Sequence, residues 1–223
     1  MSYDLTNQRV LITAASRGIG KATAAAFQSA GAKVAICARN EIQLLETKMH
    51  LETLGNQSVL AKVADLSIPE DINQLVDFVE SDFGGIDILV NNSGGPPPGT
   101  HEQIDDEQWS KAFEATLCSS IRITNRVLPS MKNKGSGRII NLSSYSVKQP
   151  MSSMILSNSI RLAALGWSKT LSNELARFNI LVNTVCTGWT KTNRVEELLE
   201  NRAIEQDATK AEIEKAITSS IPL

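Results

Sequence analysis

The sequence predicts a three-layer α/β fold, in which helices cover both faces of a doubly wound parallel sheet of the Rossmann type. Short apolar runs rich in β-branched residues alternate with helix-length segments along the whole chain. The runs are continuously apolar, which is typical of strands that are covered on both faces. A turn containing Gly18 and Gly20 follows the first run and opens the first helical segment, as the nucleotide-binding turn of such folds does.

These patterns predict six strands and five helices. Pro69 favours a helix start because a first-turn N–H has no helical partner to lose, and Asp105 favours one because a helix N-terminus stabilises a carboxylate. No linker or charge block interrupts the pattern, so we expect one domain over residues 1–223. The strands are expected at residues 10–13, 33–37, 58–63, 86–90, 138–142 and 180–185, and the helices near residues 18–30, 41–54, 69–83, 105–134 and 151–178.

The composition limits the classes of partner. The 223 residues are 42% hydrophobic and 21% charged, as in a soluble globular protein. A net charge of −2 provides no basic field for nucleic acid. No apolar run approaches the roughly 18 residues of a membrane span, and the first residues lack the pattern of an export signal. We therefore expect a cytoplasmic protein with neither nucleic-acid nor membrane partners.

Cys37, Cys118 and Cys186 are far apart in the sequence and form no C-x-x-C pair. This spacing favours three reduced thiols over a disulfide framework, and it indicates no metal site.

Residues 151–167 carry a single charge, that of Arg161. A helix that is apolar on nearly all sides must be covered on nearly all sides. One side can pack on the sheet, and we expect the other to meet a second copy of the chain in a homodimer or homotetramer. The alternative is that another part of the same chain covers it.

Residues 13–20 form a turn between a strand and a helix, in which backbone N–H groups can approach a pyrophosphate. Residues 36–40 hold no acid that would accept the ribose hydroxyl of NAD. Instead Arg39 lies there and Arg17 lies in the turn, and each guanidinium can fork onto phosphate oxygens. These two arginines favour NADP(H) as the cofactor. The alternative is that both are solvated surface residues.

Three segments resemble the short-chain dehydrogenase/reductase family. Residues 13–20 match its Thr-Gly-x-x-x-Gly-x-Gly motif except at Ala14, residues 91–94 resemble its Asn-Asn-Ala-Gly, and residues 137–144 read Gly-Arg-Ile-Ile-Asn-Leu-Ser-Ser. Within the family the chain is similar to 3-oxoacyl-(acyl-carrier-protein) reductases. The cofactor-binding positions that this resemblance implies are Thr13, Ala15, Ser16, Arg17, Gly18, Ile19, Gly20, Arg39, Asn40, Asp65, Leu66, Asn91, Ser93, Gly94, Arg161, Gly188, Thr190 and Thr192.

The resemblance also implies four catalytic positions, where the family has an asparagine, a serine and a Tyr-x-x-x-Lys pair. Here they are Thr116, Ser144, Ser157 and Arg161, so the resemblance implies a divergent group with Ser-x-x-x-Arg in place of Tyr-x-x-x-Lys. Ser157 lacks the acidity and reach of a phenol, and Arg161 does not deprotonate. Tyr145, directly after the retained Ser144, is the candidate proton donor; the alternative is that it only shapes the substrate pocket.

The resemblance therefore predicts an oxidoreductase that transfers hydride between NADP(H) and a small-molecule or carrier-bound carbonyl. A cofactor-binding pseudoenzyme and a scaffold subunit are the alternatives. Residues 190–218 are expected to form a helical lid over the substrate. Family members continue past the Ile-Pro-Leu at residues 221–223 into a further helix and strand, so we expect the chain to lack the last strand and tail.

Overall fold

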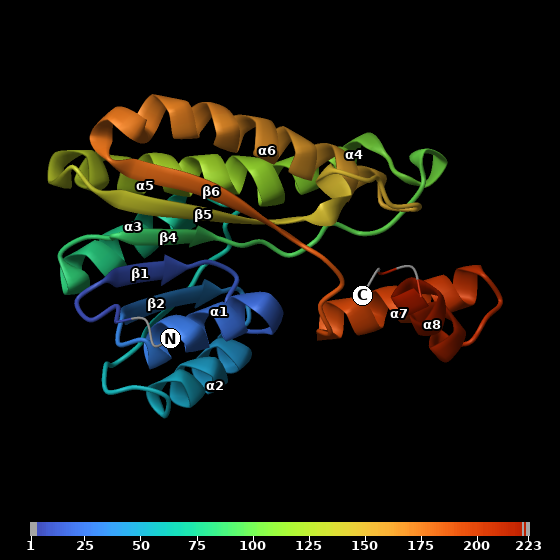
Figure 1. Ribbon diagram of the computed structural model, residues 1–223, viewed down its shortest axis with the longest axis horizontal. Coiled ribbons are helices and arrows are strands. Elements are labelled where there is room, and N and C mark those ends of the chain that lie inside the picture. The colour runs from blue at the N-terminus through green and yellow to red at the C-terminus, as the bar shows by residue number, and fades with distance from the viewer. Residues whose placement is uncertain (1–3, 220, 222–223) are drawn as a thin grey trace. The chain divides into compact units, whose positions relative to one another are not determined.

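The expected parallel sheet is present in the computed structural model, which describes residues 4–219 and 221. Six strands of this part of the chain form one sheet in the order β3-β2-β1-β4-β5-β6, with all neighbours parallel (Figure 1). This is the strand order of a doubly wound dinucleotide-binding fold, and it confirms the predicted fold class. The strands are β1 (Arg9–Ile12), β2 (Lys33–Ala38), β3 (Leu60–Val63), β4 (Ile88–Asn91), β5 (Gly137–Ser144) and β6 (Ile180–Thr187).

Helices cover the two faces of the sheet because each strand directs alternate apolar side chains to opposite sides. One core joins Leu11, Leu89 and Ile139 of the strands to α3, α5 and α6. The other joins Ile12 and Val90 to α1 and α2. The helices that form these layers are α1 (Gly18–Ser29), α2 (Glu41–Glu52), α3 (Pro69–Phe83), α4 (Asp106–Phe113), α5 (Ser119–Lys134) and α6 (Ile155–Leu175).

The helix expected at 105–134 is not continuous. A π-helical turn, η2 (Glu114–Cys118), separates α4 from α5 and contains Thr116. At the start of α5 the hydroxyl of Ser119 donates to the carbonyl of Ala115 at 2.8 Å, and that of Ser120 donates to the carbonyl of Thr116 at 3.0 Å; both acceptors lie in the π-helical turn. Such single π turns widen a helix locally and are frequent at functional sites.

The helix expected from residue 151 begins four residues later, at Ile155. Ser153 has a left-handed backbone with φ 55°, which a helix does not allow. Its carbonyl accepts from the Gly99 N–H at 2.7 Å, while the Ile155 N–H donates to the Gly99 carbonyl at 3.3 Å. The prediction for residues 151–154 was therefore wrong, because pairing with the loop after β4 replaces the first helical turn.

Residues 188–223 form a second compact unit, distinct from the unit of residues 1–187. It contains α7 (Asn193–Glu205) and α8 (Lys210–Ser219), joined by a buried contact surface that includes Leu198, Leu199 and Ile213. These two helices occupy most of the segment 190–218, whose action as a helical lid stays a prediction. Of the last three residues, only Ile221 lies within the described residues.

Among the residues that the structure describes, none lies in a helix long and apolar enough to cross a membrane.

Candidate cofactor and catalytic site

The turn after β1 lies where the order of the strands reverses, because β1 has β2 on one side and β4 on the other. Buried Thr13 ties this turn to the end of β4. Its N–H donates to the Val90 carbonyl at 3.1 Å, and its hydroxyl donates to the Asn92 carbonyl at 2.6 Å and accepts from the Asn92 N–H at 2.8 Å. The segments 13–20 and 91–94 thus meet at the carboxyl ends of the central strands β1 and β4.

Ala14 adopts a left-handed backbone with φ 46°, in the position where the motif has glycine. The amide of Asn92 holds this conformation by donating to the Ala14 carbonyl at 3.0 Å. Gly20 lies close by, and a Cβ there would come within 2.6 Å of both the Ala14 carbonyl oxygen and Asn92 Nδ2. Gly20 is therefore required for close approach, whereas Ala14 stores strain.

The other flank of the turn is tied to β2 and α2. The Ala15 N–H donates to the Cys37 carbonyl at 3.0 Å, and the Thr47 hydroxyl donates to the Ser16 carbonyl at 2.8 Å. Helix α1 then begins at Gly18, with Arg17 as an N-cap that makes no side-chain capping bond and with no acid in the first turn. A helix N-terminus of this kind favours an anion, because its dipole is positive and no carboxylate competes.

Arg39 and Asp65 follow adjacent strands and lie together at the same edge. Arg39 is 79% exposed, and its Nη1 is 3.9 Å from Asp65 Oδ2. Burial alone would raise the pKa of Asp65, but hydrogen bonds from the Ser67 N–H and hydroxyl, together with the Arg39 charge, hold this pKa below its ordinary value. Asp65 is therefore a carboxylate at neutral pH.

Two neighbouring positions also have structural roles. Asn40 caps α2 by accepting from the Gln43 N–H at 2.9 Å, and half-buried Leu66 packs against the core on the α3 side.

Asn91 belongs to a polar row that crosses three strands, of which Asn91 and Asn141 are buried and Thr184 is half-buried. Asn91, Asn141 and Thr184 are register partners on β4, β5 and β6. Asn91 Nδ2 donates to Asn141 Oδ1 at 2.8 Å and to the Thr124 hydroxyl at 3.1 Å, and the Ser168 hydroxyl accepts from Asn141 and Thr184. Sequence reasoning missed this row, although a polar residue inside an apolar strand is a usable signal.

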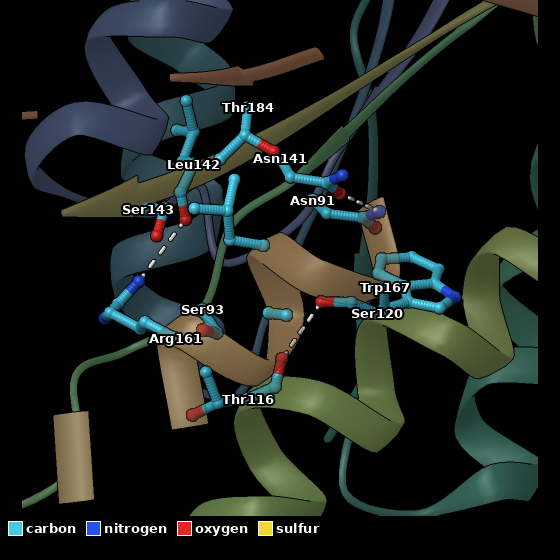
Figure 2. Close-up of a pocket in the computed structure, with 12 residues that line it drawn as sticks. Asn91, Ser93, Thr116, Ser120, Asn141, Leu142, Ser143, Arg161, Trp167 and Thr184 are labelled. Carbon is cyan, nitrogen blue, oxygen red and sulfur yellow. Dashed lines mark hydrogen bonds between the residues drawn. The ribbon is translucent and has the colours of Figure 1, made fainter. Parts of the chain in front are cut away.

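A cavity with room for roughly one water molecule lies beside this row, under α6. Asn91 Oδ1 and the Ser143 hydroxyl are buried without a protein partner, so a water there would satisfy groups that line it. Figure 2 shows Ser93, Thr116 and Arg161 on one side of the view and Ser120 with Trp167 on the other. The cavity is lined by Asn91, Ser93, Thr116, Ser120, Asn141, Leu142, Ser143, Arg161, Ala164, Leu165, Trp167 and Thr184.

Arg161 and Ser157 are joined across one turn of α6. Arg161 Nε donates to the buried Ser157 hydroxyl at 3.2 Å, and its Nη1 donates to the Leu142 carbonyl at 3.3 Å (Figure 2 shows the latter). The guanidinium therefore has a fixed orientation at the end of β5. Because Ser157 Oγ accepts from a cation, its own O–H proton remains available for donation.

Ser144 and Tyr145 lie at the end of β5 and the start of the short helix η3 (Tyr145–Val147). The Ser144 hydroxyl accepts from the Ser146 N–H at 3.1 Å, so it too can donate its proton. Tyr145 is half-buried. The neighbouring Ser143, rather than Ser144, lines the cavity.

Three cofactor-binding positions predicted from the sequence, Gly188, Thr190 and Thr192, belong to the second unit. The Thr190 hydroxyl donates to the Gly188 carbonyl at 3.4 Å, and Thr192 is the N-cap of α7. Their part in cofactor binding stays a prediction. No group of metal-binding side chains occurs among the described residues.

Together the parallel sheet, the anchored glycine turn and the polar edge define an α/β protein of the dinucleotide-binding class. The model of the short chain dehydrogenase family matches residues 8–203, and the chain belongs to this family. The 3-oxoacyl-[acyl-carrier-protein] reductase of Vibrio cholerae is 32% identical over 195 residues, which cover 87% of this chain and 78% of that protein.

Solved structures agree with this assignment. A variant of actinorhodin polyketide ketoreductase with NADPH matches with a TM-score of 0.93 and 31% identity, covering 100% of this chain and 85% of the other. L-Sorbose reductase from Gluconobacter frateurii, complexed with NADPH and L-sorbose, matches with a TM-score of 0.87 and 31% identity, covering 91% of this chain and 77% of the other.

Proposed function

We propose that the chain is an NADP(H)-dependent oxidoreductase that transfers hydride between the nicotinamide and a carbonyl or alcohol substrate, as 3-oxoacyl-(acyl-carrier-protein) reductases do. The observation that carries this is the glycine turn at residues 13–20, held on both flanks and opening an uncapped, acid-free helix N-terminus. The NADPH bound in two similar reductases is consistent with it. A substrate of the 3-oxoacyl thioester type is the first to test.

The residues present fit NADP(H). Gly20 allows the start of α1 to pack closely against Ala14 and Asn92, which supports the tight turn that a pyrophosphate site needs. Arg17 and Arg39 supply two guanidinium groups for a ribose phosphate, and Asp65 beside Arg39 would face the adenine. The bound cofactor supplies the hydride, and its ribose would lie near Arg161.

The substrate oxygen needs hydrogen-bond donors and a proton. Ser144 and Ser157 can each donate an O–H, and the fixed Arg161 charge favours developing negative charge nearby. Neither serine is acidic enough to deliver a proton efficiently near neutral pH. We propose that Tyr145 delivers it. In this proposal Ser157 and Arg161 polarise the substrate carbonyl, and the phenol of Tyr145, in the segment after β5, donates the proton.

The second candidate is a pseudoenzyme that binds the cofactor without turnover, or a scaffold subunit. The observation that favours it is the hydrogen bond from Arg161 to Ser157, because the two side chains at the expected catalytic positions bind each other. Self-association is proposed in either case, because α6 exposes Leu162 at 53% together with Ala163 and Gly166. Sedimentation velocity measures whether the chain is a dimer or tetramer.

The test is a titration of the purified chain with NADPH and with NADH, following nicotinamide fluorescence, with Arg39→Ala as the variant. Preference for NADPH that disappears in Arg39→Ala supports the cofactor assignment. Turnover of a 3-oxoacyl thioester then separates the enzyme from the pseudoenzyme. If neither nucleotide binds, both of these readings fail and the scaffold remains.

A further inference from the structure

The hydroxyl of Thr47 reaches from α2 to the glycine turn. Thr47 is 1% exposed, and its Oγ donates to the Ser16 carbonyl at 2.8 Å. We propose that Thr47 is a positioning residue, which aims the peptide between Ser16 and Arg17 toward the phosphates of the dinucleotide. This inference rests on the proposed function, since that function supplies the ligand of the turn.

The surroundings of Thr47 are apolar, so its hydroxyl is explained by the hydrogen bond to Ser16. Leu44 and Leu51 lie three residues before and four residues after it on the same buried side of α2. An apolar side chain would suit this stripe and the helix better than threonine. A buried hydroxyl is unfavourable unless it is hydrogen-bonded, and the bond that the structure gives to Thr47 Oγ is the one to Ser16.

The hydrogen bond from Thr47 to the Ser16 carbonyl also sets the direction of the next backbone N–H, that of Arg17. In a trans peptide the C=O and the N–H point in opposite directions. The Ser16 carbonyl points to α2, so the N–H of Arg17 points away from α2. Arg17 and Gly18 are exposed, whereas Ser16 is half-buried. The Thr47 bond therefore directs a backbone donor to the open side of the turn.

The same bond couples the two arginines assigned to the cofactor. Arg39 directly precedes the Asn40 cap of α2, and Arg17 directly follows the carbonyl that Thr47 holds. A shift of the turn relative to α2 would change the separation of the backbone positions that carry Arg17 and Arg39. The Thr47 bond thus holds these two backbone positions at one spacing.

The experiment compares Thr47→Val, which keeps the shape and removes the hydroxyl, with Thr47→Ser, which keeps the hydroxyl. Thr53→Val is the matched control, because Thr53 lies at the exposed end of α2 and bonds only the local His50 carbonyl at 2.7 Å among the contacts described. Two quantities are measured for each: the dissociation constant of NADPH, and amide hydrogen exchange of residues 13–20 without nucleotide.

We expect Thr47→Val to weaken NADPH binding about fivefold, the effect of losing one ordinary hydrogen bond, and to speed exchange in residues 13–20. Thr47→Ser and Thr53→Val should bind within about twofold of the parent. Parent-like binding and exchange in Thr47→Val would overturn the inference. Equal weakening in Thr47→Ser would also overturn it, because the methyl group would then be responsible.

Failure of the proposed function has a different signature. If the parent chain binds neither NADPH nor NADH, the cofactor assignment is wrong. The exchange measurement still decides the role of Thr47: faster exchange in Thr47→Val alone supports a positioned turn, and unchanged exchange contradicts it.

Discussion

Arg161 Nε donates a hydrogen bond to the hydroxyl of Ser157 at 3.2 Å, across one turn of α6. These two residues stand where related enzymes are expected to carry lysine and tyrosine. Arg161 also donates to the Leu142 carbonyl at the end of β5, which joins the helix to the sheet. Two hydrogen bonds thus orient the Arg161 guanidinium, and the Ser157 hydroxyl, which accepts from it, keeps its own proton for donation. The first prediction tests whether these two residues limit proton transfer to the substrate.

Restoring the family pattern should increase turnover. The double substitution Ser157→Tyr with Arg161→Lys introduces a phenol and a cation that can lower its pKa. General acid catalysis contributes about 10²-fold or more, so we expect kcat for a 3-oxoacyl thioester to rise by about that factor. The control is the same double variant with Ser144→Ala, which should lose the gain. An unchanged kcat in a folded double variant that still binds NADPH would show that the replaced pair does not limit the reaction.

Tyr145→Phe tests the proposed proton donor. The substitution removes only the phenolic oxygen, so pocket shape is retained. We expect kcat to fall about 10²-fold with little change in the KM of NADPH, measured by steady-state kinetics. Lys148→Ala, at an exposed position in the same loop, serves as the control and should leave kcat near the parent value. Equal rates for Tyr145→Phe and the parent would assign Tyr145 to pocket shape alone.

Ala14→Gly should stabilise the chain. The φ of 46° at Ala14 costs an L-residue about 1 kcal/mol or more, and glycine avoids this cost at the expense of a more flexible unfolded chain. We expect a net gain of up to about 1 kcal/mol in the free energy of unfolding, measured in urea. Gly20→Ala is the opposing case and should lower stability, because its Cβ would lie 2.6 Å from the Ala14 carbonyl oxygen. A loss of stability in Ala14→Gly would contradict the strain argument.

Asp87 makes stability depend on pH at the other end of the sheet. Its carboxylate is 5% exposed and accepts from Arg9 Nε at 2.8 Å and Nη2 at 2.7 Å. Burial alone would raise the pKa of Asp87, but hydrogen bonds from Arg9 and Lys134 hold this pKa far below its ordinary value. Because the folded pKa is depressed, the stabilisation is complete above the unfolded pKa of about 3.9 and is lost as pH falls below it.

Asp87→Asn should therefore lower the free energy of unfolding at pH 7 by about 3 kcal/mol, since it leaves Arg9 without its charged partner. The difference from the parent should shrink as the pH is lowered below about 4, because the unfolded parent chain then takes up a proton at Asp87 that the folded chain does not, which favours unfolding. Urea unfolding at several pH values measures both effects. Asp77→Asn is the control, because its pairing with Arg126 is exposed and contributes little. A difference that stays constant with pH would exclude Asp87 as the source.

Much of the fold was predictable because it depends on local patterns. Each expected strand overlaps an observed one, since continuous apolar runs require burial on both faces. The turn after β1 was predictable for a similar reason: Gly18 and Gly20 mark a sharp strand-to-helix connection. Two helix boundaries were not predictable. At residues 151–154 the chain pairs with Gly99, which is distant in the sequence. At residues 114–118 the helix widens into a π turn, whose carbonyls accept from the hydroxyls of Ser119 and Ser120.

The candidate site was only partly predictable. Arg39 and Asp65 were both predicted as cofactor-binding positions, and they lie 3.9 Å apart, whereas their binding of a cofactor stays a prediction. The row of Asn91, Asn141 and Thr184 was missed, because its members are distant in sequence and meet through the register of three parallel strands. Thr47 was missed for the same reason, since its partner Ser16 belongs to another element.

The sequence by itself determined the order of the elements, the glycine turn and the presence of Arg17 and Arg39, because these features depend on residue type and local spacing. Only the tertiary structure decided which groups meet: Asn92 with strained Ala14, Thr47 with Ser16, and Arg161 with Ser157 and the end of β5. The physical reason is that hydrogen bonds are short and directional, so they depend on the packing of whole strands and helices against one another.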